Sequence, residues 1–464
     1  MQSMRIPVRF LLAAAALGVA VRGQDEPGAA ALKALLDAPS ERIDLYAGVL
    51  LLGAQIGRTV PPPPDYLLRL TKTAGQAIAA GDASHAACLG AAADTVFRAE
   101  GFRSLDEDAP VESLALPQVI AHKRGPPIAL VVLVLAALRD APFPAHVLVA
   151  DGRYFVRTGP AGQERFLDVA RGAIAAALDP GVGALHLESV PALTTRQILG
   201  HYALCLGRAA QREGRDALTD RFLKIAWRLA PQNPDLYVVE GRRALAHWEL
   251  AKAERCFTRT LRLDAGVRDG HVGMAEIYVR QRRLNEATAA LEKAFAGARE
   301  DAEALRVRGE LFIARGDYRA AQDLFERLAK WKGQDARVWS DLALAHIGRN
   351  SKAGARAALE QALALAPDTP ETRFAAGELA ALEEDLSRAF AAFQKAIELN
   401  PRFAPAYLRR GAVYEAWNVP GAALRDYRTC LELLELPREH QLARDITARI
   451  EKLRAGLEAE GHGE

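Results

Sequence analysis

A pattern of 34 residues recurs seven times between Gly200 and Pro437, without insertion or deletion, and it constrains the fold more than any other feature. The copies start at residues 200, 234, 268, 302, 336, 370 and 404. The eighth position is always small: Gly207, Gly241, Ala275, Gly309, Ala343, Gly377 and Gly411. The twenty-fourth is always large: Leu223, Phe257, Leu291, Phe325, Leu359, Phe393 and Tyr427. Because a small residue lets two helices approach and a large one fills the remaining space, the pattern predicts a row of helical hairpins.

The order of small, aromatic and proline positions in this unit resembles that of the tetratricopeptide repeat. The clearest copy reads Phe374, Gly377, Ala389, Phe393, Ala396, Asn400 and Pro401. Such hairpins stack into a solenoid whose end faces need covers. Residues 438–464 predict a capping helix and tail, because Leu442, Ile446, Ile450 and Leu453 recur at helical spacing among charged residues.

The segment before the repeats predicts an α+β domain. Helical patterns run over residues 29–57, 65–80 and 83–100, and Pro61–Pro64 reads as a stiff connector. Pro126 and Pro127 start a helix at 129–138 that is apolar all round and is therefore expected to be buried. Strand-like runs follow at 146–150, 153–157 and 165–169, the first two joined by Asp151-Gly152.

This order of motifs resembles the transglutaminase-like domain of the papain-related superfamily, in the bacterial branch that carries tetratricopeptide repeats behind it. The resemblance rests on four motifs, at residues 96–102 (VFRAEGF), 123–130 (KRGPPIAL), 166–168 (FLD) and 195–199 (TRQIL). It spans residues 29–199. Together with the other sequence features, it divides the chain into four expected parts: a signal peptide at 1–23, an α+β domain at 24–199, seven repeats at 200–437, and the cap at 438–464.

The resemblance implies a catalytic cysteine at the start of the central helix, a histidine on a following strand and an aspartate on the next. Here the helix begins with Pro126, Pro127 and Ile128, and Arg153 stands where the histidine is expected. Arginine does not release its proton near neutral pH. Only Asp168 matches, so we expect a pseudoenzyme without catalytic residues, and no motif indicates a metal or cofactor.

The alternative is a papain-related amidase or transferase with a relocated cysteine nucleophile. His85 and Cys88 lie three residues apart on one predicted helix, and an adjacent imidazole lowers the pKa of a thiol. The surrounding segment is rich in alanine, however, and a cysteine buried in apolar surroundings is inert. We therefore interpret Cys88 as a core residue.

The concave groove of the solenoid is the expected binding surface, because the resemblance implies that positions 2, 5, 9 and 12 of each repeat face it. Position 9 carries Arg208, Arg242, Glu276, Glu310, Leu344, Glu378 and Ala412. The order predicts a polarised groove for an extended peptide whose acidic end lies near Arg208 and Arg242. The alternative is that these side chains belong to solvated faces with little binding energy. The asparagine and lysine set of chaperone-binding repeats is absent from these positions.

The net charge indicates the class of partner, and the N-terminal residues indicate where the protein is located. A formal net charge of +2 does not create a positive field that would attract nucleic acid, so nucleic-acid binding is not expected. Arg5 and Arg9 precede an apolar run at 10–21 and the small residues Val21 and Gly23, which together read as a secretory signal. The run is shorter than the about 20 residues that span a bilayer. We expect an exported, periplasmic or extracellular scaffold that binds a polypeptide and has no membrane span after cleavage; the alternative is an N-terminal anchor.

The signal peptide is tested by the intact mass of the protein recovered after expression in a host with a secretory pathway. We expect a mature chain that begins near Gln24, because signal peptidase cleaves after small residues. A recovered chain that begins at Met1 contradicts the cleavage.

Overall fold

The computed structural model describes residues 27–56, 66–80, 84–105, 109–150, 152–176, 187, 190–296, 301–437 and 439–459. The predicted signal peptide, Pro61–Pro64, Asp151 of the predicted hairpin and residues 460–464 lie outside the described residues. The chain divides into two compact units, Met1–Leu236 and Tyr237–Glu464. The repeats begin before this division, because the first predicted hairpin packs within the first unit.

The first unit is built on a four-stranded antiparallel sheet in the order β3-β4-β5-β6. Its strands are β3 (His146–Ala150), β4 (Arg153–Thr158), β5 (Arg165–Asp168) and β6 (Ala173–Ala176). Helix α7 (Pro127–Ala137) contacts β4, and its side chains from Ile128 to Val134 are buried, as its uniform apolarity predicts. The α+β fold class and three of the strands are therefore confirmed, whereas β6 was not predicted from the sequence.

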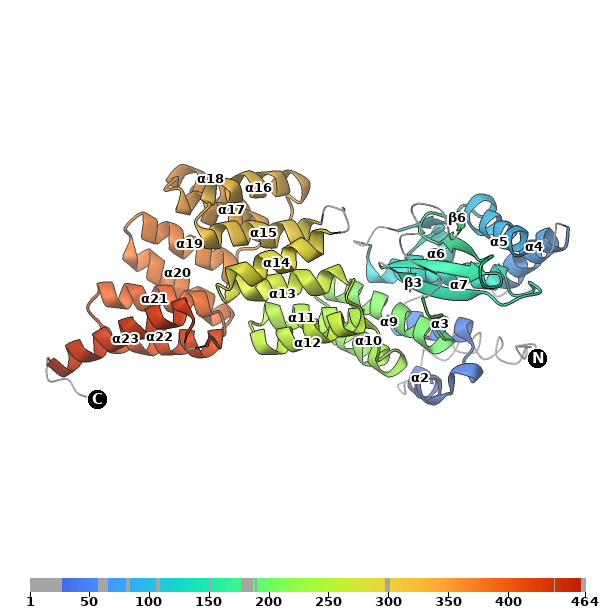
Figure 1. Ribbon diagram of the computed structural model, residues 1–464, viewed down its shortest axis with the longest axis horizontal. Coiled ribbons are helices and arrows are strands. Elements are labelled where there is room, and N and C mark those ends of the chain that lie inside the picture. The colour runs from blue at the N-terminus through green and yellow to red at the C-terminus, as the bar shows by residue number, and fades with distance from the viewer. Residues whose placement is uncertain are drawn as a thin grey trace. The chain divides into compact units, whose positions relative to one another are not determined.

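Further helices surround this core (Figure 1). They are α2 (Pro27–Asp37), α3 (Leu45–Ala54), α4 (Tyr66–Ala80), α5 (His85–Ala93) and α6 (Leu116–His122). A short parallel pair, β1 (Arg103–Ser104) with β2 (Arg124–Gly125), links two of the motifs quoted above. Helix α3 is capped by Asp44, whose carboxylate accepts hydrogen bonds from the backbone N–H groups of Tyr46 and Ala47. No helix among the described residues is long and apolar enough to cross a bilayer.

Paired helices follow the 34-residue period through the rest of the chain (Figure 1). In the first unit they are α9 (Thr195–Arg212) and α10 (Asp216–Leu229). From α11 onward they are α11 (Pro234–Ala246), α12 (Leu250–Leu263), α13 (Arg268–Arg280), α14 (Leu284–Phe295), α15 (Ala302–Arg315), α16 (Tyr318–Trp331), α17 (Ala336–Gly348), α18 (Lys352–Leu365), α19 (Pro370–Leu382), α20 (Leu386–Leu399), α21 (Ala404–Ala416) and α22 (Pro420–Leu434). Helix α23 (Gln441–Ala459) packs on α22 and buries Ile446 and Ile450, as expected of a cap.

In the hairpins that carry glycine at position 8, the structure shows the contact that the sequence predicted between positions 8 and 24. A Cβ atom placed on Gly309 would lie 2.4 Å from Cζ of Phe325, and one on Gly377 would lie 2.5 Å from Cε1 of Phe393. Phe325 and Phe393 are no more than 1% exposed. The aromatic ring therefore lies directly against the backbone of the partner helix.

The second unit also closes on itself. The Trp248 ring, after α11, packs edge-on against Phe403, before α21, with ring centroids 5.0 Å apart. The Asn400 side chain donates a hydrogen bond to the carbonyl oxygen of Ala246 over 3.3 Å. One apolar cluster consequently includes residues from Val238 to Leu311 and from Ala380 to Ile450. The 34-residue period does not predict this contact.

Gly309→Ala tests the close approach of paired helices. We expect the free energy of unfolding to fall by about 1–3 kcal/mol, because the added methyl group overpacks the Phe325 contact. Urea denaturation followed by circular dichroism measures the change. Gly456→Ala is the matched control: a Cβ there meets nothing within 4 Å, so the better helix former should stabilise by roughly 0.5–1 kcal/mol. Equal effects at both positions would contradict the packing argument.

Candidate functional site

Arg153 and Asp168, at the two strand positions where the resemblance implies a catalytic histidine and aspartate, meet in the structure as an ion pair. The register of β4 and β5 aligns Phe155 with Asp168, two residues from Arg153. The Arg153 guanidinium donates to the Asp168 carboxylate, whose side chain is 4% exposed. The same carboxylate accepts from the backbone N–H groups of Ala170 and Arg171, at 3.1 and 3.4 Å. Asp168 thus neutralises a guanidinium and caps a turn, where catalysis would need it to orient an imidazole.

The alternative pair, His85 and Cys88, lies on α5 against the sheet. Cys88 has no exposed surface. The His85 ring stacks on Phe143 with centroids 4.0 Å apart, and its backbone carbonyl accepts from the Thr158 hydroxyl. Because a reactive cysteine needs an accessible, charged surrounding, this geometry favours a core role for Cys88.

Arg208 lies on α9 in the first unit, beside a buried histidine. Its guanidinium is 3.6 Å from the Asp235 carboxylate. His201, about two turns before Arg208 on α9, places Nδ1 3.1 Å from the Tyr154 hydroxyl of β4. Burial lowers the pKa of His201 to about 4; the Asp235 charge opposes this shift and the Arg208 charge adds to it. His201 is therefore neutral at physiological pH.

Arg242, Glu276 and Glu310, three of the predicted groove residues, belong to one buried ionic network in the second unit. Its centre is Arg306, which is 4% exposed and donates to Glu303 over 2.9 Å and to Glu310. Arg242 donates to Glu303 over 2.7 Å and lies 3.4 Å from Glu276. The charges of these side chains therefore compensate one another.

Burial and pairing compete within the network. Burial works most strongly against the charge of Arg306, but Glu303, Glu310 and Glu276 together hold its pKa well above the ordinary value. Although burial disfavours the ionised form of Glu303, the surrounding arginines hold the pKa of Glu303 well below its usual range. In Glu310 burial prevails and raises the pKa of the carboxyl.

Arg306 and Glu303 are not among the predicted site residues, because that prediction rests on position 9 of each repeat. They occupy positions 5 and 2 of the fourth repeat, which the resemblance also assigns to the groove. A comparison of those rows would have shown an arginine and a glutamate one turn apart. The burial of the network cannot be read from the residues at any one repeat position.

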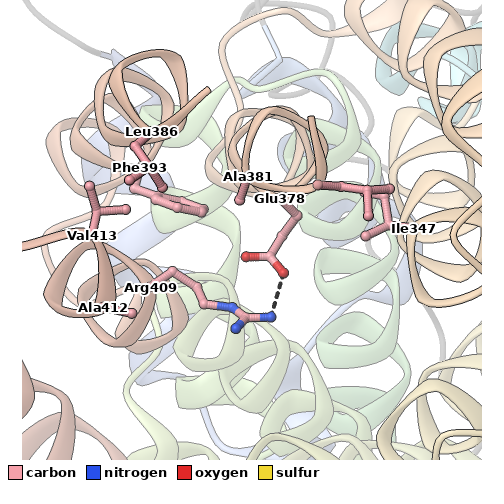
Figure 2. A pocket seen from close by; sticks show the side chains of 9 residues that line it. Ile347, Glu378, Ala381, Leu386, Phe393, Arg409, Ala412 and Val413 are labelled. Atoms are coloured by element: carbon pink, nitrogen blue, oxygen red, sulfur yellow. Dashed lines mark hydrogen bonds and ion pairs between the residues drawn. The ribbon is translucent and has the colours of Figure 1, made fainter. Parts of the chain in front are cut away.

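Glu378 lies apart from this network, in the wall of a pocket between the fifth, sixth and seventh repeats (Figure 2). The pocket has a volume of about 280 Å³. Arg409 of α21 donates to the Glu378 carboxylate over 2.6 Å, and the rest of the lining is apolar. Its other residues are Ile347, Ala381, Leu382, Leu386, Phe393, Ala412 and Val413. Glu378 and Ala412 both occupy position 9, so the pocket opens on the predicted groove face.

Two family models match the chain. Residues 65–179 match the transglutaminase-like superfamily, and residues 312–376 match the tetratricopeptide repeat. The first match covers the α7 helix and the four-stranded sheet. The second lies within the fourth to sixth repeats. The order and the identity of both parts agree with the sequence-based expectation.

Similar proteins resemble only parts of this chain. A UDP-N-acetylglucosamine–peptide N-acetylglucosaminyltransferase of Giardia intestinalis is 32% identical over 25% of the chain and 8% of its own length. The cellulose synthase operon protein C of Xanthomonas axonopodis pv. citri is 30% identical over 40% of the chain and 11% of its own length. A tetratricopeptide repeat protein from Parabacteroides merdae has a TM-score of 0.36 at 17% identity, covering 55% of this chain and 98% of that one.

His201 predicts a loss of stability in mild acid. Its pKa of about 4 in the fold lies below the 6.5 of an unperturbed histidine, so below pH 6.5 the unfolded chain binds a proton that the folded chain does not. Between pH 6.5 and 4 this linkage removes about 3 kcal/mol of stability. Urea denaturation across this range should show a shallower pH dependence for His201→Asn than for the wild type, and an unchanged one for the exposed-residue control His122→Asn. Parallel curves for all three proteins would contradict the assignment.

Proposed function

We propose that this chain, a fusion of a transglutaminase-like domain with a tetratricopeptide-repeat solenoid, is an exported scaffold that binds a polypeptide partner. The repeats supply the binding groove. The front domain is a degenerate relative of the enzymes that it resembles and contributes no nucleophile.

The observation that carries the proposal is the pocket between the fifth, sixth and seventh repeats. It combines an apolar floor with one charged pair, and ligand sites in proteins typically have such a lining with a few placed polar groups. Its walls come from helices of three successive repeats, so it depends on how the hairpins stack. An extended segment lying along the groove would reach it with a side chain.

The buried ionic network around Arg306 is proposed to make the groove rigid and not to contact the ligand. Breaking a buried ion pair by removing one partner costs roughly 3–5 kcal/mol, so the arrangement of α13, α15 and α17 around Arg306 is firmly held. A preformed groove loses less free energy to ordering when it binds its ligand. Arg242, Glu276 and Glu310 therefore support the surface, whereas Arg208 pairs with Asp235 in the first unit. Of the charged residues predicted for the groove, Glu378 is the one that lines the pocket.

The front domain is proposed to be inactive because its chemistry has been replaced. An arginine–aspartate ion pair occupies the strand positions, and proline and isoleucine occupy the start of the helix. The residual pair stabilises the β4–β5 edge. Export is proposed from the N-terminal sequence alone, through the charged, apolar and small segments described above.

The groove function is tested by screening the chain from Gln24 onward against an array of random heptapeptides. We expect a consistent subset to bind, and we expect Ala412→Trp to weaken that binding at least tenfold, because the indole fills the pocket. Arg425→Gln, an exposed change on α22, serves as the control and should bind like the wild type.

Binding that is equal in all three proteins would place the ligand elsewhere, and the absence of bound peptides would contradict the scaffold. The inactive front domain is contradicted by a different result: turnover of a peptidyl amide together with fast, selective alkylation of Cys88 by iodoacetamide.

A further inference from the structure

We infer that the pocket lined by Glu378, Phe393, Arg409 and Val413 selects a peptide segment in which an apolar side chain stands next to an acidic one. The inference rests on the proposed function and specifies its ligand. The apolar side chain occupies the floor, and the acidic side chain pairs with Arg409.

The size of the pocket limits what it can accept. Drug-sized ligands occupy pockets of about 300–1,000 Å³, and this one measures about 280 Å³. Phe393 is almost fully buried and Val413 is 4% exposed, so their surfaces form a firm apolar floor. One large aliphatic or aromatic side chain is the appropriate occupant.

The charge at the rim favours a carboxylate. Glu378 is deep in the wall, with 10% of its side chain exposed, whereas 52% of the Arg409 side chain is exposed. Figure 2 shows the two groups facing each other across the pocket. The carboxylate that partners Arg409 is thus withdrawn from solvent while the guanidinium, with five N–H donors, remains accessible. A second carboxylate can approach Arg409 from the open side.

A second cation strengthens this preference. Arg282, after α13, donates to the carbonyl oxygen of Ala314 over 2.7 Å. The pKa of Arg282 is lowered by partial desolvation of its guanidinium and by the positive charge of Arg409, although Tyr318 opposes the shift. The positive charge of Arg282 therefore adds to that of Arg409.

The acidic end of the ligand is therefore assigned to the sixth and seventh repeats. The order of charges at position 9 predicted this acidic end near Arg208 and Arg242, in the first and second repeats. Arg242 is bonded to Glu303 and lies against Glu276, so its charge is compensated inside the network. Charge complementarity favours Arg409, whose only carboxylate partner in the described structure is the recessed Glu378.

Two substitutions with opposite expected effects test the inference. The probe is a fluorescein-labelled, C-terminally amidated peptide with leucine next to glutamate, flanked by glycine and serine, and its affinity for the chain from Gln24 onward is measured by fluorescence polarisation. Arg409→Gln should weaken binding about tenfold, because it removes the charge-assisted hydrogen bonds. Glu378→Gln should strengthen binding severalfold, because Arg409 then lacks its internal carboxylate. Arg425→Gln should leave the affinity unchanged.

Matched peptides separate the two halves of the site. Replacing glutamate by glutamine in the peptide should reproduce the Arg409→Gln loss and remove the gain in Glu378→Gln, while replacing leucine by serine should abolish binding. Thermal unfolding of each variant confirms that it is folded.

The inference is overturned if the Glu378→Gln and Arg409→Gln proteins change affinity in the same direction, or if a free C-terminal carboxylate is required in place of the glutamate. If array peptides bind the wild type and the pocket variants alike, the inference fails while the scaffold function stands. If no peptide binds the wild type, both fail.

Discussion

The contact between a small residue on the first helix of each repeat and a large residue on the second is the constraint on which the rest of this structure depends. At Gly309 and Gly377 the partner ring leaves no space for a single methyl group. Because the contact recurs every 34 residues, each hairpin has nearly the same geometry and stacks on the next in the same way. The groove, the pocket and the cap all follow from that repetition.

Repetition alone does not explain how the concave face is used. The edge-on contact of Trp248 with Phe403 closes the second unit, and an ionic network around Arg306 fills part of its interior. Charged residues that the sequence suggested for ligand binding are paired with one another in this network. What remains open is the pocket at Glu378 and Arg409, where the lining is apolar and the accessible charge is positive.

In the front domain an ion pair joins the two strand positions at which the family resemblance implies catalytic residues. The register of β4 and β5 brings these two positions together. With arginine in place of histidine, the same proximity produces an ion pair instead of a proton relay. The buried helix α7 still organises the core, because packing depends on the apolar character of its side chains and not on the residue at its start.

The sequence alone determined the repeats, the central buried helix and three of the four strands, because each depends on local periodicity or on residue identity. The resemblance to tetratricopeptide repeats assigned Glu378 to the groove. Only the tertiary structure decided which charges are free: the repeat pattern does not show that Glu276 would be buried against Arg306, that Arg242 would pair with Glu303, or that Arg409 would stay accessible. Those outcomes depend on how inner side chains of neighbouring repeats meet, as Arg306 does with Glu276 and Arg409 with Glu378. A 34-residue period does not specify such contacts.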